Sequence, residues 1–167
     1  MPGPVSRFLE EDHRRLGRLL ETSLRPAGGV DLEAYGPFRA GLLRHIALEE
    51  KVLLPVLRER LGGPPPMARQ LRVEHGALAS LLVPTPTREL IAEILSILEP
   101  HNAMEEGEGG LYALADTLPR GVAAEVVARM SAYPEVKVAK YYDGPRACRT
   151  AAEALALSAQ QKEPAAR

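Results

Sequence analysis

The four histidines of this 167-residue chain are the side chains whose spacing points most directly to chemistry. Two of them have a glutamate four residues later: Glu49 follows His45 in RHIALEEKVLL, and Glu105 follows His101 in PHNAMEEGEGG. Residues four apart lie on one face of a helix, so each imidazole and its carboxylate can reach the same point. Each pair therefore predicts half of a polar site, provided that the surrounding sequence is helical.

All four histidines lie on apolar faces of expected helices, as in the series Leu9, His13, Leu16. Burying a titratable side chain there is costly unless opposite charge or a hydrogen-bond network meets it. The order H, HxxxE, H, HxxxE on successive helices therefore predicts one shared interior site. Its expected members are His13, His45, Glu49, His75, His101 and Glu105.

This donor set indicates a metal centre. Imidazole and carboxylate together suit iron, manganese or zinc, whereas calcium and magnesium prefer oxygen ligands alone. Four imidazoles and two carboxylates exceed the needs of one tetrahedral zinc, but they suit two metals bridged by both glutamates. Two six-coordinate iron ions would keep about two positions each for an oxo or hydroxo bridge, water or a diatomic molecule. Zinc or manganese are possible substitutes.

Several polar residues next to the expected ligands have two interpretations. Asp12, Glu50, Glu74 and Glu106 can orient the imidazole rings or add ligands, or they can be solvated acids at helix edges. Glu74 and Glu106 are the first candidates for an additional ligand. Tyr112 can donate a hydrogen bond toward the site, or it can be a packing residue near a helix end.

Clusters of proline and glycine divide the chain into helical segments, and strand alternation is absent from the sequence. Asp31 is expected to cap the second helix, Pro55 to bend it, and Thr85 with Pro86 to begin the fourth. Short loops favour antiparallel neighbours, so we expect an all-α, up-down-up-down four-helix bundle. The four helices are expected at about residues 6–24, 31–61, 66–82 and 85–105.

A C-terminal helical extension follows the expected bundle. Three of the four residues 107–110 are glycine, which is expected to break the fourth helix at Gly107. Residues 120–133 predict a shorter helix, 133–145 an irregular strap, and 146–161 a last helix, while the final KEPAAR is expected to be frayed. The bundle is assigned to residues 1–118 and the extension to residues 119–167.

Four stretches resemble the hemerythrin-like proteins of the HHE cation-binding type: EEDHRRL, RHIALEEKVLLPVL, VEHGAL and PHNAMEEGEGGLYAL. With their helices they cover about residues 5–115. The resemblance implies a bundle with a non-haem di-iron site, in which the four histidines are terminal ligands and Glu49 and Glu105 are bridges. Oxygen-carrying members add a histidine one turn after the third-helix histidine, where this chain has Ala79. The set is therefore more similar to that of iron-centre repair proteins and iron-sensing domains, although the N-terminal cysteine segment usual in repair proteins is not expected here.

Composition limits the expected partners and compartment. The formal net charge of -1 argues against a nucleic-acid surface, and no apolar run is long enough for a membrane span or a signal peptide. The single cysteine, Cys148, is expected to be a passive thiol. We expect a cytoplasmic protein whose partner is a small diatomic or peroxide ligand, without nucleic acid or membrane.

Three functions are compatible with this pattern. The first is a di-iron protein that binds or reduces a small oxidant such as dioxygen, peroxide or nitric oxide, and whether it is an enzyme is not decided by the sequence. The second is an iron- or oxygen-sensing or iron-centre-repair module that acts through a protein partner. The third is a structural bundle with an adventitious zinc ion.

Overall fold

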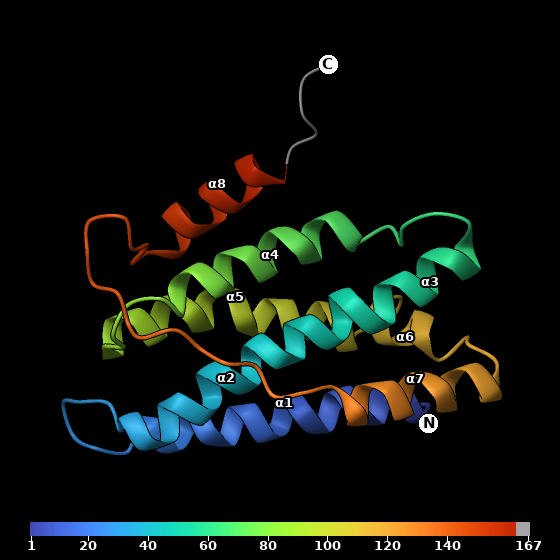
Figure 1. Cartoon of the computed structure of the whole chain (residues 1–167), viewed down its shortest axis with the longest axis horizontal. Coiled ribbons are helices and arrows are strands. Elements are labelled where there is room, and N and C mark those ends of the chain that lie inside the picture. The colour runs from blue at the N-terminus through green and yellow to red at the C-terminus, as the bar shows by residue number, and fades with distance from the viewer. Residues whose placement is uncertain (163–167) are drawn as a thin grey trace.

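The computed structural model describes residues 1–162, which form helices and loops without any strand. The helical fold class is therefore confirmed. Four long helical segments lie along one another in Figure 1. They are α1 (Pro4–Ser23), α2 (Leu32–Leu48) with its continuation, α4 (Ala68–Leu81) and α5 (Arg88–Glu106).

The second segment changes its helical geometry halfway along. Asp31 caps α2 as predicted, but α2 continues through a π-helical turn, η1 (Glu49–Leu53), into α3 (Leu54–Leu61). In this turn the Leu54 N–H donates to the carbonyl of Glu49, five residues back. Pro55 follows directly and has no N–H for the regular ladder. A modest bend was expected at Pro55, and the structure shows a widened helical turn just before it. Widened turns of this kind are frequent at functional sites.

The start of α5 differs from the prediction. Thr87, not Thr85, is the N-cap, and its hydroxyl accepts from the Leu90 N–H at 3.1 Å. Thr85 instead donates its hydroxyl hydrogen to Asp143 at 2.6 Å, in the segment after α7. The prediction that Pro86 is the first helical residue was wrong because a distant segment takes the Thr85 hydroxyl.

A layer of polar side chains separates the apolar interior into two clusters. One cluster contains Leu9, Leu48 and Leu71, and the other contains Leu16 and Leu78. On α1 and α4 the histidine lies between a leucine of one cluster and a leucine of the other. The apolar clusters therefore hold the helices together on both sides of the polar layer.

The chain after α5 follows the predicted order. It contains α6 (Leu111–Ala115), α7 (Arg120–Ala132), an irregular strap at residues 133–150 and α8 (Ala151–Gln161). In Figure 1 the strap crosses the α2 side of the molecule and α8 lies against α4. Cys148 is a buried free thiol in the second apolar cluster. The tail that was expected to fray lies, from residue 163 onward, outside the described residues.

Two arginines of α2 fasten the strap. Buried Arg39 donates to the carbonyls of Leu82 at 2.6 Å and Ala139 at 2.7 Å, and its guanidinium lies 4.4 Å from the centre of the Tyr141 ring. Arg44 donates to the carbonyls that end α7. Because planar guanidinium groups can satisfy several carbonyls at once, these contacts hold a segment without helical hydrogen bonds of its own.

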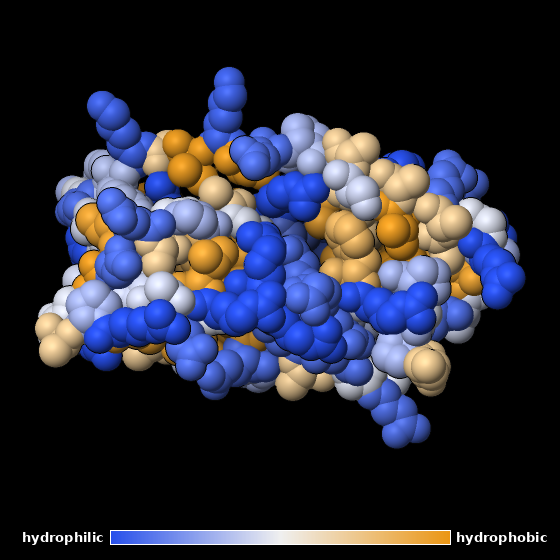
Figure 2. All heavy atoms as spheres, turned by 90° about the horizontal axis from the view of Figure 1, so that it is seen from below, coloured by the Kyte–Doolittle hydropathy of each residue, from blue (hydrophilic) through white to orange (hydrophobic). Residues whose placement is uncertain are grey.

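The face seen from below in Figure 2 carries hydrophilic side chains across its middle. Ion pairs follow the exposed side of α1, where Arg14 pairs with Glu10 and Glu11, and Arg18 also pairs with Glu11. Among residues 1–162, no helix combines the length and the apolar character that a membrane crossing requires.

Candidate metal centre

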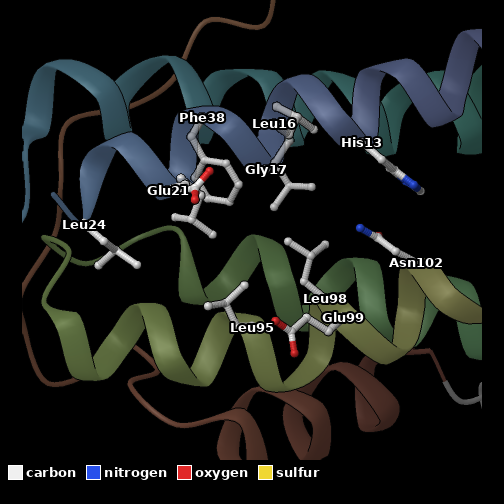
Figure 3. A pocket seen from close by; sticks show the side chains of 12 residues that line it. His13, Leu16, Gly17, Glu21, Leu24, Phe38, Leu95, Leu98, Glu99 and Asn102 are labelled. Carbon is white, nitrogen blue, oxygen red and sulfur yellow. The ribbon is translucent and has the colours of Figure 1, made fainter.

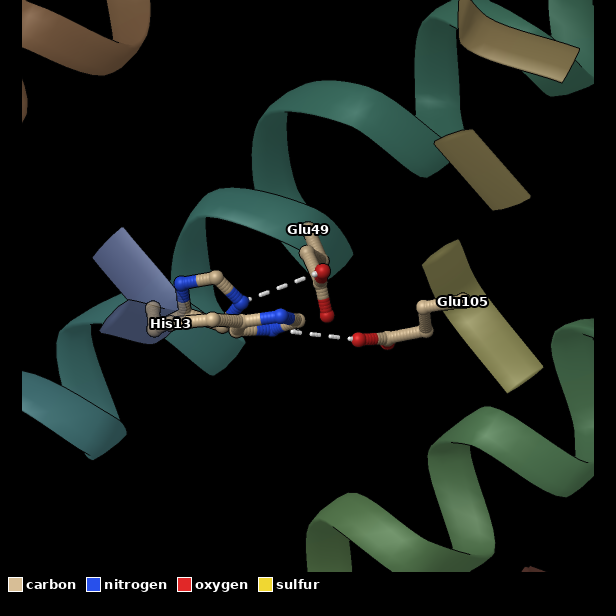
Figure 4. Close-up of side chains that lie close together, drawn as sticks. His13, Glu49 and Glu105 are labelled. Atoms are coloured by element: carbon tan, nitrogen blue, oxygen red, sulfur yellow. Dashed lines mark ion pairs between the residues drawn. The ribbon is translucent and has the colours of Figure 1, made fainter. Parts of the chain in front are cut away.

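The six predicted site residues converge in the polar layer. Their donor atoms form two groups, within each of which all atoms lie within 4.8 Å of one another, and every member is buried. The close-up in Figure 4 shows His13, Glu49 and Glu105 pointing toward one another from separate helices. The first group is His13, His45, Glu49 and Glu105, and the second is Glu49, His75, His101 and Glu105.

Each glutamate gives one carboxylate oxygen to each group. Glu49 Oε1 lies 3.2 Å from His45 Nε2 in the first group, and Glu49 Oε2 lies 3.1 Å from His75 Nε2 in the second. Glu105 repeats the arrangement, because its Oε2 lies 3.4 Å from His13 Nε2 and its Oε1 lies 2.9 Å from His101 Nε2. Each of these carboxylates therefore belongs to both donor groups at once and could contribute an oxygen to a cation in either.

Four further acids form a ring around the site. Each contacts the outer nitrogen, Nδ1, of a histidine on the next helical segment, and the last closes the ring from α5 to α1. The pairs are Asp12 with His45 at 2.9 Å, Glu50 with His75 at 3.1 Å, Glu74 with His101 at 2.7 Å, and Glu106 with His13. Of the two interpretations of these acids, the structure therefore favours orientation of the rings.

The acid ring sets which imidazole nitrogen faces the interior. Hydrogen bonds to histidines outweigh burial and lower the pKa values of Asp12, Glu50 and Glu74, so these carboxylates are charged acceptors. An ionised carboxylate can only accept a hydrogen bond, so the Nδ1 nitrogen donates. In the neutral imidazole the inward Nε2 then has a free lone pair, which is the form that binds a metal.

Without cations, protons on the imidazoles balance part of the buried negative charge. Burial opposes a charge on His45, but the charge of Glu49 outweighs it and raises the pKa of His45 to about 10. At His101 the hydrogen bond with Glu105 likewise outweighs burial and raises the pKa to about 9. Burial favours a neutral Glu105, yet hydrogen bonds with histidines hold its pKa well below the usual range. Without cations, therefore, His45 and His101 hold protons and Glu105 is ionised.

The residues fit bound metal better than protons alone. Six carboxylates surround four imidazoles, so negative charge remains even if every imidazole is protonated. Among residues 1–162, three buried inward atoms lie close to other donor atoms of the site but find no partner at a favourable hydrogen-bond angle: Glu49 Oε2, His75 Nε2 and Glu105 Oε1. Buried polar atoms without partners are rare in native proteins. All three belong to the second group, where a cation would satisfy them.

Tyr112 also belongs to the site. It is 1 % exposed, and its hydroxyl donates to Glu49 Oε1 at 2.8 Å. The sequence left two interpretations of Tyr112 open, a hydrogen-bond donor toward the site or a packing residue near a helix end, and the structure shows the donor. The structure places Tyr112 on α6, immediately after the turn formed by residues 107–110, here called the glycine turn.

The glycine turn and α1 together position Tyr112. Gly109 has a φ of 73°, in the left-handed region that favours glycine. A side chain on Gly110 would collide with the carbonyl oxygens of Met104 and Glu105, so the chain folds back tightly on the end of α5. The hydroxyl of buried Ser6 of α1 then lies 3.0 Å from the carbonyl oxygen of Tyr112 and 2.6 Å from a carboxylate oxygen of Asp116, so it can donate to either and links α1 to the segment that carries Tyr112.

An apolar cavity reaches the site from one side. It has a volume of about 460 Å³ and lies between α1, α2 and α5. Figure 3 shows His13 and Asn102 at one end and Leu24 at the other, with leucines and Phe38 between them. This cavity gives small uncharged molecules a path toward the His13 side of the site.

The family model described as hemerythrin HHE cation binding domain matches residues 5–120. No curated protein gives a significant match. No solved structure does so either. The matched range includes all six predicted site residues and Tyr112. Together with the buried donor groups, this match indicates a bound metal cation.

Proposed function

The chain belongs to the hemerythrin HHE cation-binding domain family, and from this premise we propose that it holds two iron ions and binds or reduces a small oxidant such as dioxygen, peroxide or nitric oxide. The observation that carries the proposal is the sharing of Glu49 and Glu105 between two donor groups. Two such groups call for two cations close together. Bound iron would supply exchangeable coordination positions and one-electron chemistry.

The donor types favour iron among the candidate metals. Each group offers two imidazole nitrogens and two carboxylate oxygens. Zinc in structural sites prefers four ligands with sulfur or nitrogen predominant, whereas mixed nitrogen and oxygen sets with open positions are typical of non-haem iron. Manganese and zinc stay possible substitutes in this proposal.

The surroundings of the site support a small uncharged ligand. The cavity beside His13 is lined mainly by leucines and Phe38, and it is large enough for a diatomic molecule or peroxide. The outer acids hold the imidazoles in place, and the two apolar clusters exclude water from the sides of the layer. The protein's own contribution is therefore to position the donors and to restrict access.

We further infer that the long segments form an up-down-up-down four-helix bundle within residues 1–118, with an extension that begins at residue 119. The acid ring supports this arrangement, because it links each segment to the next and closes α5 on α1. A cytoplasmic location without nucleic-acid or membrane partners is part of the same proposal. The single buried Cys148, which cannot form an internal disulfide, is compatible with a reducing compartment.

Metal analysis and spectroscopy of the aerobically purified protein test the proposal. We expect two iron ions per chain and the near-ultraviolet charge-transfer absorption and antiferromagnetic coupling of a bridged ferric pair. His45→Ala and Glu49→Ala should each lower the iron content sharply, because each removes an inward donor. Glu59→Ala, an exposed acid of α3, is the matched control. A single zinc per chain with no effect of these variants would contradict the proposal.

A second function, sensing through a partner, is favoured by the packing of α8. Ser158 of α8 donates to the carbonyl of Val73 at 2.6 Å, and its hydroxyl lies where a side chain on Gly76 would be. Both contacts flank His75, so a shift of α4 on metal loss would reach α8. Hydrogen exchange of metal-loaded and metal-free protein distinguishes the functions, since a sensor should change its protection in α8 and the strap as well as at the ligands.

A further inference from the structure

The hydroxyl oxygen of Tyr112 lies next to every donor atom of the first group. Its distances are 2.8 Å to Glu49 Oε1 and 3.3 Å to Glu105 Oε2. To the inward nitrogens they are 3.0 Å for His13 Nε2 and 3.3 Å for His45 Nε2. A hydroxyl has one hydrogen to donate and two lone pairs that accept, so hydrogen bonds account for at most three of these four contacts.

These distances are those expected between neighbouring ligands of one cation. Bonds of about 2.1 Å at right angles place adjacent donor atoms about 3 Å apart. Two neighbouring pairs within the group itself have this spacing, since His45 Nε2 lies 3.2 Å from Glu49 Oε1 and His13 Nε2 lies 3.4 Å from Glu105 Oε2. The distances from Tyr112 Oη to the four donors match those of a fifth ligand of the same cation.

Within the part of the chain that the structure describes, residues 1–162, the second group has no neighbour placed as Tyr112 is beside the first. Its inward atoms include the three buried atoms without a hydrogen-bond partner, Glu49 Oε2, His75 Nε2 and Glu105 Oε1. Tyr112 contacts the opposite oxygens of the two shared glutamates, Oε1 of Glu49 and Oε2 of Glu105. The tyrosine is thus available to only one of the two cation positions.

The main chain fixes this position of Tyr112 independently of any metal. The tight glycine turn leaves no room for a side chain at Gly110, and the hydroxyl of buried Ser6 lies between the Tyr112 carbonyl and the Asp116 carboxylate. The short helix α6 also contacts α1, and its Leu111 and Ala115 belong to the first apolar cluster. The phenol is therefore held in place by elements that do not depend on the ligands.

We propose that Tyr112 is a fifth protein ligand of the cation held by His13, His45, Glu49 and Glu105, so that the two positions of the centre are chemically unequal. This inference rests on the proposed metal binding. When the Oη–metal bond forms, the Oη–H bond breaks and the proton leaves to the buffer. The first cation then has five protein ligands, while the second has four and keeps more positions for an exogenous ligand.

Optical spectroscopy of iron-loaded protein tests the assignment. Metal-free protein is loaded with ferrous iron and oxidised in air, and we expect a visible phenolate-to-iron(III) charge-transfer band with tyrosinate modes in the resonance Raman spectrum. Tyr112→Phe should lose the band while still binding two iron ions. Tyr35→Phe, which removes the hydroxyl of another fully buried tyrosine in the other apolar cluster, should keep it.

A titration with zinc gives a readout that does not depend on iron. Ligation should produce the ultraviolet difference spectrum of one tyrosinate per chain in the wild type and in Tyr35→Phe, and none in Tyr112→Phe. Two bound iron ions without any tyrosinate signal would overturn the Tyr112 ligand and leave the proposed function standing. Failure to bind iron, with a zinc-induced tyrosinate signal, would contradict the iron proposal and support the Tyr112 assignment.

Discussion

At the scale of single residues, the acids next to the histidines serve histidines of other segments. Asp12 is adjacent in sequence to His13 but binds His45, and Glu74 is adjacent to His75 but binds His101. The side chain of a residue that precedes a ligand points about 100° away from it around the helix. That direction is the interface with the next segment, so a local acid becomes a partner for a distant imidazole.

Removal of one acid of the ring should weaken metal binding without removing a metal position. For Glu74→Ala we expect a loss of affinity of about 10–100-fold, since His101 loses the acceptor that orients its ring. Isothermal titration or competition with a chelator measures the change. At saturating metal the stoichiometry should stay that of the wild type.

The matched control for Glu74→Ala is Glu59→Ala, which removes an exposed acid of α3. Equal affinities of the two variants would show that the ring acids are surface charges without a role at the site. A loss of one metal equivalent in Glu74→Ala at saturation would instead make Glu74 a ligand.

At the scale of the elements, both HxxxE helices change geometry at their glutamate. In α2 the π-helical turn η1 begins at Glu49, and α5 ends one residue after Glu105. The two ends have different causes, because Pro55 follows the first and three glycines follow the second. The second change is the one that turns the chain back and brings Tyr112 to the site.

The glycine turn should be sensitive to a single methyl group. In Gly110→Ala the new carbon would collide with backbone carbonyl oxygens of α5, which cannot move as a flexible side chain can. We expect a loss of unfolding free energy of about 1–3 kcal/mol in urea denaturation of the metal-free protein, and a weaker tyrosinate signal on metal loading.

The control for the turn is Gly121→Ala, because a side chain there meets nothing within 4 Å at the start of α7. That variant should be as stable as the wild type or slightly more stable. If Gly110→Ala matched it in both stability and tyrosinate signal, the turn would not position Tyr112.

At the scale of the whole molecule, a charged layer lies between two apolar clusters that hold the helices together. The clusters supply the free energy of burial on both sides, and the layer is tolerable only when cations or protons balance its carboxylates. Metal binding should therefore stabilise the fold as a whole, since the unfolded chain offers no such arrangement of donors.

The metal-free protein should lose stability as the pH rises. The folded pKa values of His45 and His101, about 10 and about 9, lie above the ordinary value of 6.5. The two histidines therefore contribute stability to the folded state that is complete below pH 6.5 and is lost as the pH rises through 9 to 10. The contribution of Glu105 depends on pH in the opposite direction. Because its folded pKa is lowered, it stabilises the folded state above pH 4.5, and this stabilisation is lost in acid.

Thermal unfolding of metal-free and metal-loaded protein from pH 5 to pH 10 checks this expectation. The metal-free protein should be most stable between the ordinary pKa values of the carboxylates and the imidazoles, at about pH 4.5 to 6.5. The metal-loaded protein should not share the loss at high pH, because cations replace the imidazole protons. A metal-free protein whose stability rose between pH 7 and pH 10 would contradict the charge state described for the site.

Much of the fold could be predicted because its signals are local. The positions of the long helices could be predicted to within a few residues from the apolar period of 3.6 residues. Their ends were indicated by the Asp31 cap and by the glycine cluster after Glu106. Thr85 was predicted as the cap of α5, but Thr87 is the cap, because the Thr85 hydroxyl donates to Asp143 of the strap. The widened turn at Glu49 was not anticipated, because a proline predicts a disturbed helix and not its form.

By itself, the sequence determined which side chains face the interior, since the spacing of four places His45 with Glu49 and His101 with Glu105 on single helical faces. Only the tertiary structure decided how the faces meet: which acid holds which imidazole, how each carboxylate divides its oxygens between two groups, and that Tyr112 stands beside one group alone. The physical reason is that periodicity specifies direction within one helix, whereas contacts between helices depend on packing, turns and register, which residues far apart in the chain determine together.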